Sequence, residues 1–421
     1  MNKPLTGHIR TDGEAIWIDD YLKLGGYQSL SVISKMLPQD VTKLINDSGL
    51  MGRGGAGVST GFKMAAVPMG EKAATPKYLI CNADEMEPGT FKDRWLLEGN
   101  PHQLIEGMLV SAYAIEASVA YIFVRGEYKL AIKRLEQAVK EAYSKGFLGQ
   151  SLDMHVHPSA GRYICGEETA LMNALEGKRA TPRSKPPFPP AIGVWGKPTL
   201  INNVETLCNL PHILNHGIDW YKALSKGVNA GTKIYGVSGH VKKPGAWELP
   251  MGTTARELLE VHAGGMKDGY EFKALLPGGA STDFWLEDKL DTPMDFASTA
   301  KIGTRMGTGT MIVLDDKTCP IGMLLSLEKF FKQESCGWCT PCRDGLSWVA
   351  EILSAFERGD GREADIAQLE RHARLLGPGS TFCALAPGAA SPLATGLKYF
   401  KDEFLRHIQE KSCPYANHLH R

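Results

Sequence analysis

Three cysteines spaced three residues apart constrain the fold and chemistry of this 421-residue chain more than any other feature. They are Cys336, Cys339 and Cys342, and a fourth candidate, Cys383, lies well downstream. Gly337 and Pro341 are expected to keep this stretch out of a helix, so that the three sulfurs converge in a tight loop. A Cys-x2-Cys-x2-Cys run with a distant fourth cysteine is a ligand pattern of cubane iron–sulfur clusters, which implies one-electron transfer.

Two other interpretations of these cysteines stay open on spacing alone. Zinc sites more often use two separated Cys-x2-Cys or Cys/His pairs, and some cysteines are simply buried or disulfide-bonded structural residues. The chain has nine cysteines, and the metal-like spacing of the tightest group suggests a reducing compartment. The spacing favours the cluster over both alternatives.

The overall charge excludes one large class of function. Lys and Arg together number 47, as do Asp and Glu, so the net charge is zero. A nucleic-acid-binding protein would carry a basic excess. The sequence shows no apolar signal core near its start and no apolar run long enough to span a membrane. We therefore expect no nucleic-acid partner and no direct membrane span.

Apolar runs alternate with helical patterns through the first half of the chain, which indicates a mostly parallel sheet. The expected strands span 77–81, 120–124 and 153–157, with helices around 104–113 and 130–139. His155 and His157 share the third strand, where we expect them to face opposite sides and not to form a metal pair.

From residue 232 the pattern becomes that of a small α+β module without a reactive constellation. A hairpin is expected over 234–241 and 245–249, and a strand over 272–276. After the apolar run 311–314 the chain is expected to be helical, ending in a polar tail where His418 and His420 are solvated. These patterns predict three domains, at 1–230, 231–310 and 311–421.

The glycine-rich segment 52–63 contains the motif G-x-G-x-x-G, but it follows a helical pattern, so an ordinary dinucleotide fingerprint is doubtful. Glycines let the backbone approach a phosphate or a flat ring closely, and Arg53 and Lys63 add positive charge nearby. The alternative is a flexible surface loop.

Acidic residues occupy two further candidate positions. Asp84, Glu85 and Glu87 follow the first expected strand, where ligands of open α/β sheets bind. Glu167 and Glu168 begin an expected helix after Gly166, and there they also stabilise the helix through its dipole. The alternative for the first group is a solvated acidic turn.

A proline-rich segment, 181–190, predicts a stiff extended loop. It suits either a ligand for a proline-binding module or, as we prefer, a rigid wall that holds Lys185 in place. Beyond it, Asn202, Asn203 and Thr206 present two amides and a hydroxyl before another helix.

Taken together, six motifs resemble those of one family. They are GRGGAGVSTG at 52–61, CNADEMEPGT at 81–90, GRYICGEETAL at 161–171, SKPPFP at 184–189, NNVET at 202–206 and ESCGWCTPCR at 334–343. The chain resembles, nearly end to end, the family of NADH-binding FMN/4Fe-4S flavoprotein subunits of respiratory complex I, the F-type subunits of NADH:quinone oxidoreductase. The same core occurs in the diaphorase subunits of NAD-linked hydrogenases and formate dehydrogenases.

The resemblance implies an α/β Rossmann-like flavin domain, a small α+β ubiquitin-like (SLBB, β-grasp) domain and a C-terminal helical bundle with a 4Fe-4S cluster. It implies that FMN is lined by Gly52, Gly54, Gly55, Lys63, Asn82, Asp84, Tyr163, Gly166, Glu167, Asn202, Asn203 and Thr206. Glu87, Glu168 and Lys185 would contact NAD(H), and Cys336, Cys339, Cys342 and Cys383 would bind the cluster. Glu87, Glu167 and Glu168 are the expected catalytic-site carboxylates.

The implied function is hydride transfer from NADH to FMN, followed by single-electron steps to the cluster and to partner subunits. The expected partners are a thioredoxin-like 2Fe-2S subunit of the E type and a large iron–sulfur subunit of the G type. The expected location is the cytoplasmic face of the inner membrane, reached through the complex. A soluble hydrogenase or formate dehydrogenase diaphorase and a redox-inactive zinc scaffold stay as alternatives.

One position departs from the family pattern. The family usually reads GAGF, and its aromatic residue resembles a platform for the adenine of NADH. This chain has Val58 there, with Ala65 and Ala66 a turn onward. Loss of a stacking surface costs about 1–3 kcal/mol in nucleic-acid sites, so we expect weaker NADH binding than in relatives with Phe.

Overall fold

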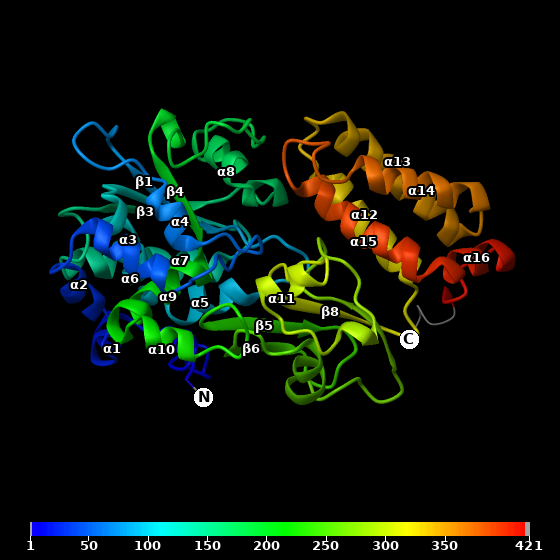
Figure 1. Cartoon of the computed structure of the whole chain (residues 1–421), viewed down its shortest axis with the longest axis horizontal. Helices are drawn as coiled ribbons and strands as arrows, with labels where there is room; N and C mark the ends of the chain where they lie inside the picture. The colour runs from blue at the N-terminus through cyan, green and yellow to red at the C-terminus, as the bar shows by residue number, and fades with distance from the viewer. Residues whose placement is uncertain (1, 417–421) are drawn as a thin grey trace.

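The computed structural model describes residues 2–416, so His418 and His420 lie outside the described residues. Three regions follow one another along the chain: a parallel sheet with its helices, a second sheet, and a helical bundle (Figure 1). Among the helices described, none combines the length and the apolar character needed to cross a membrane.

The first sheet has four parallel strands in the order β3-β2-β1-β4. These strands are β1 (Tyr78–Ala83), β2 (Val119–Val124), β3 (Asp153–Pro158) and β4 (Thr199–Asn203). Cys81 at the centre pairs with Ile122 on β2 and with Asn202 on β4. The three strands expected from the apolar runs are therefore confirmed, and the fourth ends in the two asparagines 202 and 203.

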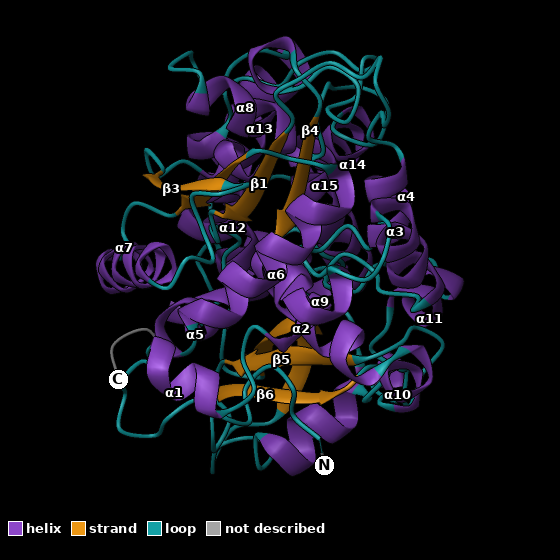
Figure 2. Cartoon of the chain, turned by 90° about the vertical axis from the view of Figure 1, so that its left-hand side faces the viewer, coloured by secondary structure: helices purple, strands orange, loops and turns teal. Residues whose placement is uncertain are grey.

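Both faces of this sheet are covered, as expected for parallel strands. Leu79 and Cys81 face a core that includes α6 and α9, whereas Ile80 belongs to the core on the opposite face. Figure 2 shows α6 and α9 between the two sheets. The helices of this region are α1 (Ile18–Lys23), α2 (Gln28–Ile33), α3 (Pro38–Asp47), α4 (Thr60–Ala65), α5 (Lys92–Gly99), α6 (Pro101–Ile115), α7 (Lys129–Ser144), η1 (Tyr163–Gly166), α8 (Glu168–Leu175), η2 (Val194–Gly196), α9 (Val204–His216) and α10 (Ile218–Ala223).

The expectation that His155 and His157 face opposite sides of their strand is wrong. Residues two apart on a strand share a face. His155 packs on Tyr121 with ring centroids 5.3 Å apart, and His157 stacks on Phe123 at 5.5 Å. Both histidines thus pack against aromatic rings of the neighbouring strand β2.

The second sheet has the order β6-β5-β8-β7, with a parallel β5–β8 pair between two antiparallel pairs. Its elements are β5 (Thr232–Ser238), β6 (Gly245–Pro250), η3 (Glu257–His262), β7 (Phe272–Leu276), η4 (Glu287–Lys289), α11 (Phe296–Lys301) and β8 (Thr310–Asp315). The hairpin β5–β6 is confirmed. The division at 310/311 stays a prediction, and β8 lies across it while pairing with β5 and β7.

The described residues after β8 are mainly helical, as expected. It comprises α12 (Pro320–Glu334), α13 (Thr340–Arg358), α14 (Glu363–Leu375), α15 (Leu385–Tyr399) and α16 (Lys401–Glu410). Gly337 does interrupt the helical structure, because it has φ +80° in the loop between α12 and α13. Pro341, however, stands in the first turn of α13, so the expectation that it prevents a helix is wrong. Proline suits that position because its missing N–H would have no helical partner there.

Candidate active site

A cavity of about 350 Å³ opens at the carboxyl ends of β1 and β4, the usual ligand position of an open α/β sheet. Asn82 and Asn203 end these strands side by side in register. The cavity is lined by Gly54, Gly55, Ala56, Asn82, Asp84, Glu85, Met86, Glu87, Thr90, Lys92, Asp93, Tyr163, Ile164, Gly166, Glu167, Asn203, Gly278, Ser281, Arg305, Gly307, Thr308, Cys383, Ala384 and Leu385.

Asp84 is a buried carboxylate whose two oxygens have no hydrogen-bond partner among the described residues. Burial raises its pKa to about 7. A buried charge without partners is costly, so this side chain is arranged for a hydrogen-bond donor that the protein itself does not supply.

Glu85 lines the cavity, and its carboxylate also makes contacts that the sequence did not indicate. Its carboxylate accepts hydrogen bonds from the backbone N–H groups of Asp93 (2.9 Å) and Arg94 (3.1 Å) and from the Tyr128 hydroxyl (3.0 Å). It therefore caps the start of α5, and burial raises its pKa. The side chain contributes to the cavity wall chiefly by fixing this helix.

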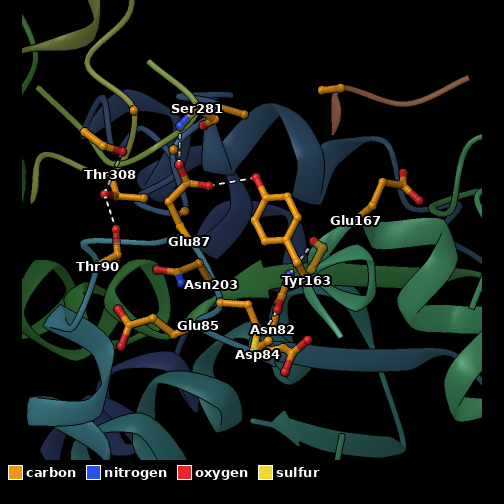
Figure 3. A pocket seen from close by; sticks show the side chains of 18 of the residues that line it. Asn82, Asp84, Glu85, Glu87, Thr90, Tyr163, Glu167, Asn203, Ser281 and Thr308 are labelled. Carbon is orange, nitrogen blue, oxygen red and sulfur yellow. Dashed lines mark hydrogen bonds between the residues drawn. The ribbon is translucent and has the colours of Figure 1, made fainter. Parts of the chain in front are cut away.

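Glu87 points across the cavity and is held from two sides (Figure 3). The Tyr163 hydroxyl donates to Glu87 Oε2 at 2.7 Å, and the Ser281 backbone N–H donates to Oε1 at 2.7 Å. Burial raises the pKa of Glu87, although these two donors oppose the shift. The structure thus fixes the position of this carboxylate.

Residues from the region of the second sheet also line the cavity. The sequence had indicated no cluster of functional residues in this region. Ser281, Arg305 and Thr308 line the wall, and the Thr308 hydroxyl is 2.7 Å from that of Thr90 (Figure 3). The glycines of the turn Pro277–Gly279 are the sequence signal that could have indicated this contribution to the cavity. Gly279 has φ +96°, and a Cβ on it would lie only 2.5 Å from Glu87 Cγ, so the close approach of this turn to Glu87 requires glycine.

Lys92 is a further cavity residue that the sequence did not indicate. Its ammonium is buried 2.7 Å from Asp93 Oδ1 and 2.9 Å from Glu205 Oε2. Burial lowers the pKa of Lys92, but the two carboxylates outweigh it and raise the pKa above its usual range. Glu205 also contacts Lys233 at 2.6 Å, which completes a buried ionic cluster behind the cavity.

A larger cavity of about 830 Å³ adjoins the first. The two share Gly54, Ala56, Asn82, Gly166, Glu167 and Asn203. The larger one is also lined by Gly52, Gly57, Val58, Phe62, Lys63, Ala66, Glu168, Lys185, Pro186, Pro187, Phe188, Pro189, Pro190, Ala191, Ile201, Asn202 and Thr206. The proline-rich segment forms part of its wall, in agreement with the preferred interpretation.

Glu167 and Glu168 have different roles: Glu167 caps a helix, and Glu168 pairs with lysines. Glu167 is the N-cap of α8, because its Oε2 accepts from the backbone N–H groups of Thr169 (3.0 Å) and Ala170 (2.8 Å). Glu168 Oε1 contacts Lys185 Nζ at 2.5 Å, and Glu167 Oε1 lies 3.4 Å from the same ammonium. Burial opposes the charge of Lys185, but the two glutamates together raise its pKa.

Lys63 approaches the same charge cluster from α4. Its ammonium donates to the Ile201 carbonyl at 2.5 Å and lies 3.8 Å from Glu168 Oε2. Burial lowers the pKa of Lys63, and Glu168 partly offsets that effect. Lys63 and Lys185 thus share Glu168, and both ammonium groups lie where they can contact an anionic ligand in the larger cavity.

The glycine-rich loop lies against the end of β4. A Cβ on Gly54 would come within 3.2 Å of Asn203 Cβ, so the close approach requires glycine. The Arg53 side chain lines neither cavity. Its guanidinium is buried and donates to the Tyr221 hydroxyl (3.1 Å) and to the Ala230 carbonyl (2.8 Å).

The amides and hydroxyl after β4 also lie at the cavities. Asn202 Nδ2 is buried without a hydrogen-bond partner in the described part of the chain. Asn203 caps α9 by accepting from the Glu205 N–H at 3.0 Å, and the Thr206 hydroxyl accepts from the Arg53 N–H at 2.8 Å. Asn202 is thus the free amide of this group.

The unsatisfied polar atoms fit a flavin mononucleotide. Asp84 requires donors, Asn202 requires an acceptor, and the Lys63 ammonium suits an anion. A flavin carries N–H and carbonyl groups on its ring, hydroxyls on its ribityl chain and a phosphate. The residues present at the two cavities therefore suit FMN.

The four predicted cluster cysteines come together although the fourth is 41 residues from the third. All four line one small cavity together with Ile164, Pro182, Trp338, Thr381, Phe382, Leu385 and Ala386. Cys339 is the N-cap of α13 and Cys342 lies in its first turn, where the helix dipole favours an anionic group. Burial raises the pKa of Cys383 to about 12. Four converging thiols suit an iron–sulfur cluster.

Comparison with known protein families agrees with this geometry. Residues 45–212 match the model of the Nuo51 FMN-binding domain, residues 234–284 the SLBB domain, and residues 322–407 the NADH-ubiquinone oxidoreductase-F iron-sulfur binding region. The first range holds the glycine-rich loop and the acidic residues, and the third holds all four cysteines. These matches confirm the predicted fold class, FMN and the 4Fe-4S cluster, and they disfavour the zinc scaffold.

Individual relatives cover nearly the whole chain. The F-type subunits of NADH-quinone oxidoreductase from Salmonella typhimurium and from Escherichia coli are each 53% identical, over 98% of this chain and 94% of theirs. The corresponding protein of Mycobacterium bovis is 45% identical over 93% of this chain and 89% of its own.

A solved structure, an NAD+-reducing [NiFe]-hydrogenase in its H2-reduced state, superimposes with a TM-score of 0.82. It is 32% identical over 93% of this chain, which spans 66% of the hydrogenase chain. Sequence and structure together show that this chain belongs to the family of F-type subunits of NADH-quinone oxidoreductase.

Proposed function

We propose that the chain is the electron-input subunit of an NADH:quinone oxidoreductase, oxidising NADH and passing single electrons onward. One observation carries this proposal: Ile164, Cys383 and Leu385 line both the 350 Å³ cavity and the cysteine cavity. The proposed flavin cavity and the cluster cysteines thus share a wall. FMN when bound supplies the conversion between hydride transfer and one-electron transfer.

The chain's own residues bind and orient the reactants. Asn82, whose Nδ2 donates to the Gly166 carbonyl at 2.9 Å, fixes the backbone around the flavin position. Asp84 and Asn202 supply the unsatisfied acceptor and donor. Glu87, positioned by Tyr163 and Ser281, is available to a polar group of the nucleotide.

Charge at the mouth of the larger cavity supports binding of a dinucleotide. Lys63 and Lys185 lie on either side of Glu168, so a phosphate can displace or share the carboxylate contact. Glu167 keeps its capping role on α8, so its charge stays fixed near the flavin position. No side chain is required to act as a nucleophile.

The exit side supports docking of other subunits. Trp338 and Phe382 are exposed beside the cluster cysteines, with ring centroids 6.3 Å apart. Exposed aromatic residues are favoured at protein interfaces. The partners we propose are a thioredoxin-like 2Fe-2S subunit of the E type and a large iron–sulfur subunit of the G type. Through them the chain would lie at the cytoplasmic face of the inner membrane.

Glu168→Gln tests the proposal. Removing this charge changes how Lys63 and Lys185 are held, so we expect a changed KM for NADH or a reduced rate in NADH-dependent ferricyanide reduction. Glu260→Gln is the matched control, because Glu260 is an exposed carboxylate paired with Arg256 away from both cavities. If Glu168→Gln keeps the parent KM and rate, the assigned role is wrong.

A second candidate is the diaphorase of a soluble NAD-linked hydrogenase or formate dehydrogenase. The structural match to the NAD+-reducing [NiFe]-hydrogenase supports it. The higher identity to the F-type subunits of NADH-quinone oxidoreductase, 53% over almost the full chain, favours the first candidate. Purification of the native assembly separates them: quinone-reducing membrane subunits support the first, and a hydrogenase or formate-oxidising subunit supports the second.

A further inference from the structure

A second group of metal-type ligands lies in the helical bundle, apart from the four cluster cysteines. Cys319, Glu357, His407 and Cys413 each place one ligand atom so that all four atoms lie within 4.8 Å of one another. We propose that these four residues bind a structural zinc ion. Neither Cys319 nor Cys413 falls within the residues 322–407 that match the iron–sulfur model.

The four ligands come from three helices and the segment that follows the last. Cys319 is the N-cap of α12, Glu357 lies in the last turn of α13, His407 lies on α16, and Cys413 follows it. The helices α12 and α13 are joined by the iron–sulfur loop at their other end. A 15-residue helix such as α12 is about 22 Å long, so the two sites are at opposite ends of one helical hairpin.

The geometry around His407 favours a metal ligand. Its Nδ1 is 2.7 Å from the Glu403 carbonyl, which can only accept, so Nδ1 carries the proton. The other ring nitrogen, Nε2, faces Glu357 Oε1 at 3.3 Å and Cys319 Sγ at 3.4 Å. A cation bound between His407 Nε2, Glu357 Oε1 and Cys319 Sγ would be coordinated by all three atoms. A backbone carbonyl on the other ring nitrogen is the usual support of a zinc-bound histidine.

The Cys319 sulfur is fixed in place by its neighbours at the start of α12. The Gly322 N–H donates to Sγ at 3.2 Å, and the N-terminus of α12 favours negative charge there. The Cys319 thiol donates to Glu357 Oε1 at 3.0 Å. Coordination of a divalent ion would replace that proton, because coordinated thiols are deprotonated.

The fourth ligand is held in place by its own contacts. A Cβ on Gly359, just after α13, would be 2.0 Å from the Lys411 carbonyl oxygen, so the segment leading to Cys413 lies directly on that helix end. The Tyr415 hydroxyl donates to Glu403 Oε1 at 2.5 Å, which fixes the chain on the other side of Cys413. The site is therefore built before any ion binds.

The ligand set favours zinc. Cysteine sulfur, histidine nitrogen and carboxylate oxygen are all ligands that zinc accepts, and four protein ligands make a closed tetrahedral site without an open position. Ligand atoms around tetrahedral zinc are about 3.3–3.8 Å apart, given bond lengths of about 2.0–2.3 Å. The distances of 3.0 Å, 3.3 Å and 3.4 Å above need only small adjustments. The alternatives are a Cys319–Cys413 disulfide and a purely hydrogen-bonded cluster.

The test uses the full chain with FMN and cluster, purified anaerobically after growth with added zinc. Elemental analysis should give about one zinc per chain in addition to the cluster iron. The double variant Cys319→Ser/Cys413→Ser should lose zinc and keep iron and FMN. Cys208→Ser, a buried cysteine elsewhere, should keep both metals. Cys383→Ser should lose iron and keep zinc.

X-ray absorption at the zinc edge of the unmodified protein decides the matter if the double variant does not fold. Two sulfur and two lighter ligands are expected. Protein without zinc after exposure to excess zinc would overturn the proposal. So would full zinc retention in both Cys319→Ser/Cys413→Ser and His407→Asn, a zinc shell of four sulfurs, or a Cys319–Cys413 disulfide found by mass spectrometry.

Discussion

Phe188 is the aromatic side chain best placed to replace the stacking surface that Val58 lacks. It is 57% exposed and lines the 830 Å³ cavity together with Val58 and Phe62. It lies three residues after Lys185 in the proline-rich wall, so little conformational freedom remains to be lost on binding. Phe188→Ala should therefore weaken binding of the adenine end of NADH.

The size of the effect follows from the exposed area. A phenylalanine side chain has about 200 Å² of surface, so an exposed fraction of 57% leaves about 115 Å². An adenine that covers one ring face buries about half of that area. At about 25 cal/mol per Å² this contributes about 1.4 kcal/mol, which is about a tenfold change in Kd.

The assay is calorimetric titration with ADP-ribose, which carries the adenine but no nicotinamide and so transfers no hydride. Phe188→Ala should raise Kd about tenfold, and Val58→Phe should lower it. Trp348→Ala removes an exposed aromatic outside both cavities and serves as the control. The assignment to Phe188 would be refuted if Phe188→Ala kept a Kd within about twofold of the parent. It would also be refuted if the affinity for ADP-ribose fell in Phe62→Ala and not in Phe188→Ala.

Two further predictions concern buried charges near the first cavity. Glu205 lies between Lys92 and Lys233, so Glu205→Gln leaves the buried Lys233 ammonium without a carboxylate partner, while Lys92 keeps Asp93. The change should cost about 3–5 kcal/mol of stability in urea denaturation, and an unchanged urea midpoint would contradict this. Burial raises the pKa of Asp84 from 3.8 to about 7, so the folded flavin-free protein binds a proton more tightly than the unfolded chain, and its stability should fall as pH rises through that interval. In Asp84→Asn the urea midpoint should lose this fall between about pH 4 and about pH 7, and an equal pH dependence of the midpoint in both proteins would exclude the effect.

Local sequence patterns were sufficient for much of the fold. The strands β1, β2 and β3 and the helices α6 and α7 appear as short apolar runs and helical periodicities, because these depend on neighbours within one element. The Cys-x2-Cys-x2-Cys run is likewise local. Glu85 and Glu167 were correctly seen near the cavity, but their capping contacts depend on helix starts that the sequence locates only approximately.

Tertiary structure decided which distant residues meet. Arg53 is next to the glycines in sequence, yet its side chain is buried against Tyr221 on the far side of the loop. Arg305 and Thr308 come from a region with no motif, and only the packing of the second sheet's loops places them beside Glu87. Sequence patterns do not predict such contacts, because each residue of the pair is by itself an ordinary polar residue.

The same contrast separates the two cysteine sites. The sequence by itself indicated the iron–sulfur site and favoured it over zinc or structural thiols, because three of its ligands recur at three-residue spacing in one short segment. Cys319, Glu357, His407 and Cys413 have no such spacing, since helices α12, α13 and α16 deliver them from points far apart in the chain. Only the packing of those helices brings the four ligand atoms within 4.8 Å of one another.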